Sequence, residues 1–227
     1  MMSMSSIAST LRKPYAGIQM EGLVAAWYAR ITRDRRDYPI TADAIAARLP
    51  AGSAILEVAP GPGYLAIELA RRGFAVTGLD ISRSFVKIAS AGAQRGGVAV
   101  AFREGDVAHM PFATHSFDYV VCQAAFKNFP DPVAALNEIH RVLKPGAQAS
   151  IYDLRKDAPS AAIDDEIESM HLPAVSAFLT RFTFRYGLLR AAYTRPRLES
   201  VVMRSRFGGG EVYAEGIGFE LKLAKAR

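Results

Sequence analysis

The sequence contains little cysteine and no long hydrophobic run. Its one cysteine, Cys122, excludes an internal disulfide framework and a cysteine-rich zinc site. No segment approaches the ~20 apolar residues that would span a bilayer. The first fifteen residues, MMSMSSIASTLRKPY, have no apolar core of signal-peptide length. We therefore expect a cytoplasmic protein in a reducing compartment, with no membrane span and no metal site.

The middle of the chain is close to neutral. Residues 51–150 contain nine basic and eight acidic side chains, whereas residues 180–227 contain ten basic and four acidic ones. The net charge of +6 therefore belongs mainly to the C-terminal part. A basic region can attract anions or nucleic acid, or it can simply be a solvated surface, and the composition leaves both readings open.

From residue 53 onward, short apolar runs alternate with amphipathic segments. Helices are predicted from Tyr64 to Arg72, after a Ser82 N-cap, and from an Asp131 cap to Pro145. Strands bounded by turn residues are predicted at 54–58, 75–79, 98–102, 117–121 and 149–154. This alternation predicts an α/β fold with a doubly wound, mostly parallel sheet.

The flanking segments complete a single domain over residues 1–227. We assign N-terminal helices to residues 1–50, one holding Trp27 and Tyr28 and another over 41–49, and a ligand-binding core to 51–154. Residues 155–195 form a lid or substrate-recognition insertion with an apolar helix at 174–184, and 196–227 hold a C-terminal helix and strand pair. Strands at 210–215 and 218–224 are expected around a glycine turn.

A glycine-rich turn follows the first predicted strand, in the stretch ILEVAPGPGYLAIELA. The turn runs from Ala59 to Gly63, where glycines let the backbone approach a ligand and the next helix presents unpaired amides. Asp80 ends the second strand and could accept both hydrogen bonds of a ribose diol. Asp106 follows the third strand and could bind the exocyclic amine of adenine. Acids after three consecutive parallel strands predict a site for an adenosine-containing ligand.

Glu57 separates two classes of adenosine ligand. It lies four residues before the first glycine, so its carboxylate would face the group held by the turn. A carboxylate repels the pyrophosphate of a dinucleotide and attracts a cationic amino acid. Adenosine that carries a methionine, with its ammonium and sulfonium, therefore fits this charge better.

Four stretches together resemble the class I S-adenosylmethionine-dependent methyltransferases, in particular the small-molecule branch with the ubiquinone and menaquinone enzymes (methyltransferase type 11). They are ILEVAPGPGYLAIELA, VTGLDIS, EGDVAHMPFATHSFDYVVCQAAF and FPDPVAALNEIHRVLKPGA. The resemblance covers about residues 50–154 and implies S-adenosyl-L-methionine as cofactor, S-adenosyl-L-homocysteine as product, and a seven-stranded Rossmann-like sheet with an antiparallel C-terminal strand. Ala59 stands where that family usually has glycine, and Lys127 where relatives often have histidine.

The resemblance also implies roles for individual residues. Glu57 and the turn would line the methionine part, Asp80 and Ile81 the ribose, and Asp106 and Val107 the adenine. The full set of predicted cofactor-binding residues is Tyr28, Glu57, Ala59, Pro60, Gly61, Gly63, Asp80, Ile81, Asp106, Val107, Cys122 and Gln123.

Methyl transfer from a sulfonium needs a general base only if the acceptor must lose a proton. His171, just before the predicted apolar helix, is the first candidate, and Tyr152 and Asp153 at the end of the fifth strand are further candidates for catalytic roles. Arg181, Arg185 and Arg190 could bind an acidic group of the acceptor or pair with the acidic 164–168 stretch. The predicted partner is a small aromatic or apolar methyl acceptor, bound by a monomer or homodimer.

Three other functions stay open at this stage. A nicotinamide-dependent oxidoreductase has the Tyr152-x-x-x-Lys156 spacing in its favour, but Tyr152 lies on a predicted strand. A nucleic-acid methyltransferase fits the basic C-terminal part, but strand four ends in CQAA and lacks the Asn/Asp-Pro-Pro element that grips a flipped base. A catalytically silent cofactor-binding protein would have the same cofactor motifs.

Overall fold

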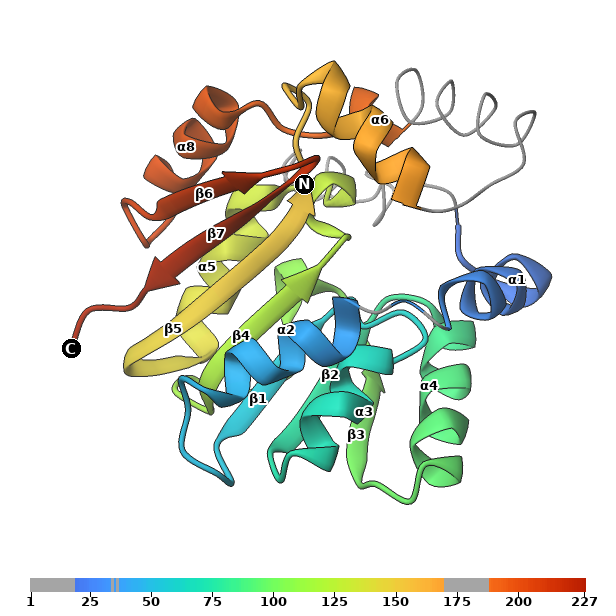
Figure 1. The fold of residues 1–227 in the computed structure, drawn as a ribbon. Coiled ribbons are helices and arrows are strands. Elements are labelled where there is room, and N and C mark those ends of the chain that lie inside the picture. Colours follow the sequence, from blue (N-terminus) through green and yellow to red (C-terminus); the bar gives the residue numbers. More distant parts are fainter. Residues whose placement is uncertain (1–18, 34, 36, 170–187) are drawn as a thin grey trace, which may run out of the picture.

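The structure is a computed structural model that describes residues 19–33, 35, 37–169 and 188–227. Figure 1 shows a central sheet with helices on both faces. The strands are β1 (Ala54–Val58), β2 (Ala75–Asp80), β3 (Val100–Glu104), β4 (Phe117–Gln123), β5 (Leu143–Leu154), β6 (Glu211–Glu215) and β7 (Gly218–Ala224). The main helices are α1 (Gly22–Thr32), α2 (Asp37–Ala46), α3 (Tyr64–Arg71), α4 (Arg83–Arg95), α5 (Pro132–Val142), α6 (Ser160–Ser169) and α8 (Arg195–Met203).

The seven strands follow the order β3-β2-β1-β4-β5-β7-β6. The first five are parallel to one another, and β7 is antiparallel to both β5 and β6. The predicted doubly wound sheet with an antiparallel C-terminal strand is therefore confirmed. The strand order reverses between β1 and β4, and ligands of such sheets bind beyond the carboxyl ends of the strands at this point.

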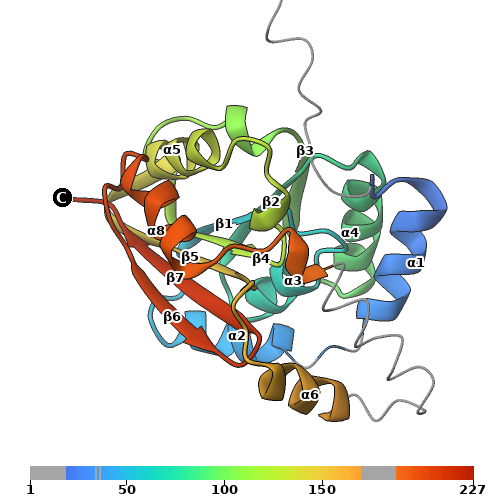
Figure 2. The same cartoon turned by 90° about the horizontal axis from the view of Figure 1, so that it is seen from above.

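Two layers of apolar side chains hold the helices against the sheet. Ile45 of α2 and Leu65 and Leu69 of α3 pack on Ile55 and Val121 on one face. On the other face, the buried side of α5 and α8 packs on the strands through residues that include Leu56, Val120, Leu136, Ile139, Ile151 and Leu198. Seen from above in Figure 2, α2 and α3 lie on the opposite side of the sheet from α5, with α1 beside α4.

The predicted helix caps at Ser82 and Asp131 are confirmed. The Ser82 hydroxyl accepts from the amide of Phe85, and the Asp131 carboxylate accepts from that of Ala134. Several predicted boundaries were wrong. The helix predicted to reach Pro145 ends at Val142, and the fourth strand extends to Gln123 and not only to residue 121. The third strand is 100–104 and not 98–102, the fifth begins at Leu143 and not at residue 149, and the second N-terminal helix is Asp37–Ala46 and not 41–49.

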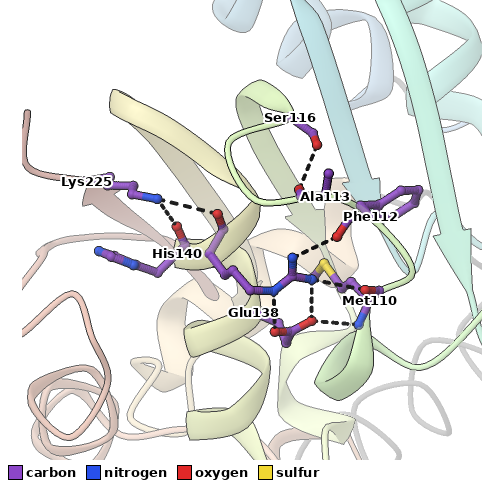
Figure 3. Close-up of polar contacts among 8 residues, drawn as sticks. Met110, Phe112, Ala113, Ser116, Glu138, His140 and Lys225 are labelled. Carbon is purple, nitrogen blue, oxygen red and sulfur yellow. Dashed lines mark hydrogen bonds and ion pairs between the residues drawn. The ribbon is translucent and has the colours of Figure 1, made fainter.

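Helix α5 is joined to the loop that follows Asp106 by a set of polar contacts (Figure 3). The Glu138 carboxylate accepts from the Met110 amide, while the Arg141 guanidinium pairs with Glu138 and donates to the carbonyls of Met110 and Phe112. At the end of α5, the Lys225 ammonium donates to the carbonyls of His140 and Leu143. These contacts satisfy carbonyls at the helix end and fix the loop beside β4.

Candidate functional site

The carboxyl ends of β1 and β2 are joined through the glycine-rich turn. The backbone amide of Gly61 donates to Oδ2 of Asp80 at 2.9 Å, and the amide of Ser82 donates to Oδ1 at 2.8 Å. Ala59 also donates its amide to the carbonyl of Leu79 at 2.8 Å. Asp80 is 6% exposed, so the turn is built around a buried carboxylate. Each carboxylate oxygen has a second lone pair that a ligand hydroxyl could use.

The turn has a backbone that side chains rarely adopt. Gly61 and Gly63 have φ values of +54° and +81°, in the left-handed region that glycine enters without strain. A Cβ on Gly63 would lie 2.7 Å from the Phe102 ring and 2.8 Å from the Ala89 side chain, whereas one on Gly61 would have only the Phe85 ring at 3.9 Å. Gly63 is thus needed for packing, and Gly61 keeps the turn open above the sheet.

Glu57 is the most unusual group at this edge. Its side chain is 3% exposed, and its Oε2 has no hydrogen-bond partner among the described residues. The pKa of this carboxyl is raised to about 8, mainly by burial and to a smaller extent by the nearby charge of Asp80, while the backbone amide of Ala66 acts in the opposite direction. Burial likewise raises the pKa of Asp80, to about 6. A bound cation would supply the partner that Glu57 lacks.

A second orphaned oxygen lies on the same face of the sheet. Val121 of β4 pairs with Glu57, so Gln123, two residues further along, shares its face. The Gln123 amide nitrogen donates to Asp37 Oδ2 of α2 at 3.1 Å, and its buried Oε1 has no partner in the described part of the chain. Within the described residues, two acceptor oxygens without donors therefore lie on the same face of β1 and β4, the strands on either side of the strand-order reversal.

Asp106 and its neighbours follow β3, an edge strand of the sheet, and form the part of the candidate site next to that strand. The Asp106 carboxylate accepts from the amide of Ala108 at 2.9 Å and thereby begins a short 3-10 helix, Val107–His109. Its side chain is 35% exposed, so it remains accessible to a ligand. Ile81 and Val107 are half-buried on either side of this edge.

Helix α1 lies over α4 and next to the turn. The Tyr64 hydroxyl donates to the Ala29 carbonyl at 2.6 Å, and the Glu21 carboxylate accepts from the Ser84 amide at 3.1 Å. Tyr28 makes an edge contact with the Phe85 ring, with 5.8 Å between centroids, and burial raises the pKa of its hydroxyl. Phe85 is the ring that faces Gly61, so Tyr28 lies near the turn, where the sequence predicts a cofactor contact.

The remaining predicted residues lie in different surroundings. Cys122 is fully buried in the apolar layer on the α5 face, opposite to Glu57. The Tyr152 hydroxyl donates to Glu220 of β7 at 2.9 Å, and Asp153 pairs with Lys127 at 2.7 Å. His171, Arg181, Arg185 and the predicted 174–184 helix lie outside the described residues.

Two participants were not predicted from the sequence. Asp37 and Lys127 reach the site through contacts with Gln123 and Asp153, residues 86 and 26 positions away. The one signal in the sequence for these two residues was that Lys127 stands where related sequences often have histidine. Among the residues that the structure describes, there is no cluster of three or more potential metal ligands.

Comparison with known proteins assigns this geometry to a family. Residues 56–151 match the family model described as a methyltransferase domain. Over this stretch the chain is similar to a methyltransferase domain. The stretch includes Glu57, the glycine-rich turn, Asp80, Asp106 and Gln123, and it ends within β5, so the matched region contains most of the predicted cofactor contacts.

Curated relatives of the chain include methyltransferases that are named for ubiquinone and menaquinone. The chain is 33% identical over 127 residues to the ubiquinone biosynthesis O-methyltransferase of Xanthomonas oryzae pv. oryzae, covering 55% of this chain and 53% of the relative. It is 34% identical over 140 residues to the demethylmenaquinone methyltransferase of Chlorobaculum parvum, covering 60% and 56%. The chain thus spans about half the length of the curated relatives it matches.

A solved structure extends the likeness of fold beyond the matched region. A putative S-adenosyl-L-methionine-dependent methyltransferase from Methanococcus maripaludis is 20% identical, with a TM-score of 0.74 over 93% of this chain and 96% of that chain. At this identity the likeness concerns the fold alone. In the described residues, no helix is both long and apolar enough to cross a membrane.

Proposed function

We propose that the chain is an S-adenosylmethionine-dependent methyltransferase that acts on a small acceptor of the quinone or phenol type. The observation that carries the proposal is the buried Glu57 carboxyl, one oxygen of which has no partner in the described part of the chain, beside a glycine turn tied to Asp80. A cationic methionine group fits this site because it can pair with the ionised form of Glu57, whereas a pyrophosphate would add negative charge next to the buried Asp80 carboxylate.

The residues at the strand ends would divide the cofactor among them. Glu57 and Gln123 would accept from the ammonium of the methionine part, Asp80 would accept from the ribose hydroxyls, and Asp106 would accept from the adenine amine. Tyr28 would close over the turn from α1. When bound, the cofactor supplies a methyl group on a sulfonium, and the protein's contribution is to position the acceptor in line with that group and to exclude water.

The acceptor class rests on the names of the relatives. Their printed names concern ubiquinone biosynthesis and demethylmenaquinone, both ring systems with oxygen substituents. Because this chain spans only part of those relatives, the same acceptor is a proposal here. A reducing compartment, expected from the single buried cysteine, belongs to the same proposal.

Calorimetric titration tests the cofactor first. We expect S-adenosylmethionine and S-adenosylhomocysteine to bind with micromolar affinity and NADH not to bind, and we expect Asp80→Ala to abolish binding. Methyl transfer from labelled cofactor is then measured with dihydroxynaphthoic and dihydroxybenzoic acids, and with duplex and single-stranded DNA as counter-substrates. Binding of NADH alone would indicate an oxidoreductase, and labelling of DNA alone would indicate the nucleic-acid reaction.

A further inference from the structure

A buried ion pair lies at the carboxyl ends of β4 and β5. Lys127 belongs to a short 3-10 helix, Phe126–Asn128, directly after β4, and Asp153 lies near the end of β5. The ammonium of Lys127 is 2.7 Å from Asp153 Oδ1, and the two side chains are 9% and 0% exposed. Taking both charges out of water is costly, so a pair this deep is weak evidence for a role in stability and raises the question of what else it does.

Asp153 is already engaged by several donors. Its Oδ1 accepts from the Lys127 ammonium and from the amide of Leu154 at 2.8 Å, and its Oδ2 accepts from the amide of Lys127 at 2.8 Å. Donors therefore occupy three of the about four lone-pair sites of the carboxylate. Because the side chain is also 0% exposed, the geometry suits a group that holds Lys127 in place better than it suits a general base.

Counted over the described residues, the Lys127 ammonium has one N–H donor more than it uses. An ammonium carries three N–H groups, and within the described residues those of Lys127 have two acceptors, Asp153 Oδ1 and the carbonyl of Ala124 at 2.8 Å. Ala124 has a φ of +61°, a left-handed conformation that is strained for alanine, and its amide donates to the carbonyl of Tyr152 at 2.7 Å. The strained turn therefore fixes both the carbonyl and the lysine that binds it.

The pair lies at the same carboxyl edge of the sheet as the proposed cofactor site. Cys122, two residues before Ala124, pairs across the sheet with Val58, the neighbour of Glu57. Gln123, the residue after Cys122, pairs with Tyr152, the residue before Asp153, so the carboxyl ends of β4 and β5 are adjacent there. Because β1, β4 and β5 are parallel, the ion pair and Glu57 lie at the same edge of the sheet, with Asp153 on the α5 face and Glu57 on the other.

We propose that Lys127 binds the oxygen of the methyl acceptor through its third N–H and holds that oxygen in its ionised form, with Asp153 as the positioning residue. The ligand class is a ring hydroxyl that ionises to a phenolate or enolate. This inference rests on the proposed function.

The reaction balances without a base on the protein. The acceptor hydroxyl loses its proton to solvent on binding beside the lysine. A lone pair of the oxyanion, or the carbon conjugated to it, then forms the bond to the methyl carbon. The sulfur–methyl bond breaks with its electron pair passing to sulfur, which becomes a neutral thioether. A cation within hydrogen-bond distance lowers the pKa of an acid by roughly 1–3 units. For the acceptor hydroxyl, a shift of this size supplies the oxyanion near neutral pH.

The test uses 4-nitrophenol as a probe, because its phenolate absorbs visible light and its neutral form does not. The full-length protein is first saturated with S-adenosylhomocysteine, and the probe is added at a pH where it is mostly neutral in free solution. We expect binding to the wild type to produce the phenolate band, corresponding to a fall of at least about one unit in the pKa of the probe.

Substitutions then assign the effect to Lys127. Lys127→Met alone leaves Asp153 buried without its cation, so the variant to compare is Lys127→Met with Asp153→Asn, which removes both charges. We expect it to bind S-adenosylhomocysteine like the wild type and to leave the probe neutral. Lys144→Met is the matched control, because Lys144 forms an ion pair of the same length, 2.7 Å, with Asp118 near the start of β4. That variant is expected to keep the band.

The outcomes separate the inference from the proposed function. If the double variant still produces the phenolate band, or if the wild type loaded with S-adenosylhomocysteine never does, the role of Lys127 is wrong while the cofactor assignment stands. If S-adenosylhomocysteine does not bind the wild type, the proposed function itself fails.

Discussion

The amide of Gly61 and the carboxylate of Asp80 are joined by a hydrogen bond of 2.9 Å that ties the turn after β1 to the end of β2. The bond has two consequences. It fixes the backbone of the turn, and it holds the Asp80 carboxylate at the edge of the sheet, where a ribose would bind. A single change at Asp80 therefore affects the loop and the ligand together.

Asp80→Asn is expected to weaken S-adenosylmethionine binding by about 10- to 100-fold. The amide of asparagine cannot accept on both sides, and hydrogen bonds to a charged group contribute roughly 1.5–3 kcal/mol. Calorimetry gives the dissociation constant directly. Asp118→Asn is the matched control, because Asp118 also accepts from a backbone amide, that of Ala54, at 2.9 Å, but at the start of β4. Equal losses in both variants would mean that the effect is structural.

Glu57 is expected to release a proton when the cofactor binds. With a pKa of about 8, its carboxyl is mostly protonated at pH 7. An ammonium bound to its free oxygen favours the ionised form, so the pKa falls and up to one proton leaves. The binding enthalpy at pH 7 should therefore differ between phosphate and Tris buffers, and this difference should disappear in Glu57→Gln. A buffer-independent enthalpy for the wild type would contradict the contact.

The same group predicts a pH-dependent difference in stability. The folded-state pKa of Glu57 lies above its ordinary value of 4.5, so the folded protein binds more protons than the unfolded chain between about pH 4.5 and 8. Its contribution therefore becomes increasingly unfavourable as pH rises through that window. Relative to the wild type, Glu57→Gln should gain up to about 1.4 kcal/mol of unfolding free energy per pH unit. Urea unfolding at pH 5, 6 and 7 measures the difference, and parallel curves would show that Glu57 is not buried as described.

Much of the sheet and part of the site could be predicted from local pattern. β1, β2 and β4 are apolar runs between turn residues, and their carboxyl ends locate Glu57, Asp80 and Gln123. The start of β3 was misplaced because this strand lies at the edge of the sheet and ends in the polar pair Arg103-Glu104. β5 was predicted too short because Pro145-Gly146 is typical of a loop, whereas here Gly146 donates its amide to the Lys225 carbonyl.

The contacts that complete the site could not be predicted in this way. The Gln123–Asp37 and Lys127–Asp153 pairs join residues 86 and 26 positions apart, and only the packing of α2 and β5 brings them together. Similarly, Tyr152 is directed toward Glu220 by the antiparallel register of β5 and β7, which the sequence does not specify.

Two glycines of the turn are expected to respond differently to alanine. Gly63→Ala adds a Cβ within 2.8 Å of two side chains, in a left-handed backbone, and should cost about 3 kcal/mol or more of stability. Gly61→Ala has the backbone strain without the clash and should cost about 1–2 kcal/mol. Thermal unfolding of the two variants gives the order. Equal costs would show that Phe102 and Ala89 yield to the new side chain and that packing does not require Gly63.

The thiol of Cys122 is expected to be inert in the folded protein. It is fully buried, and burial raises its pKa, so both the access and the thiolate that a disulfide reagent needs are missing. Ellman's reagent should give no signal with the native protein and one thiol per chain after unfolding in denaturant. Because S-adenosylhomocysteine would bind on the opposite face of β4, adding it should not expose the thiol. Rapid reaction of the native protein would instead place Cys122 at an accessible edge of the site, where it could contact the cofactor after all.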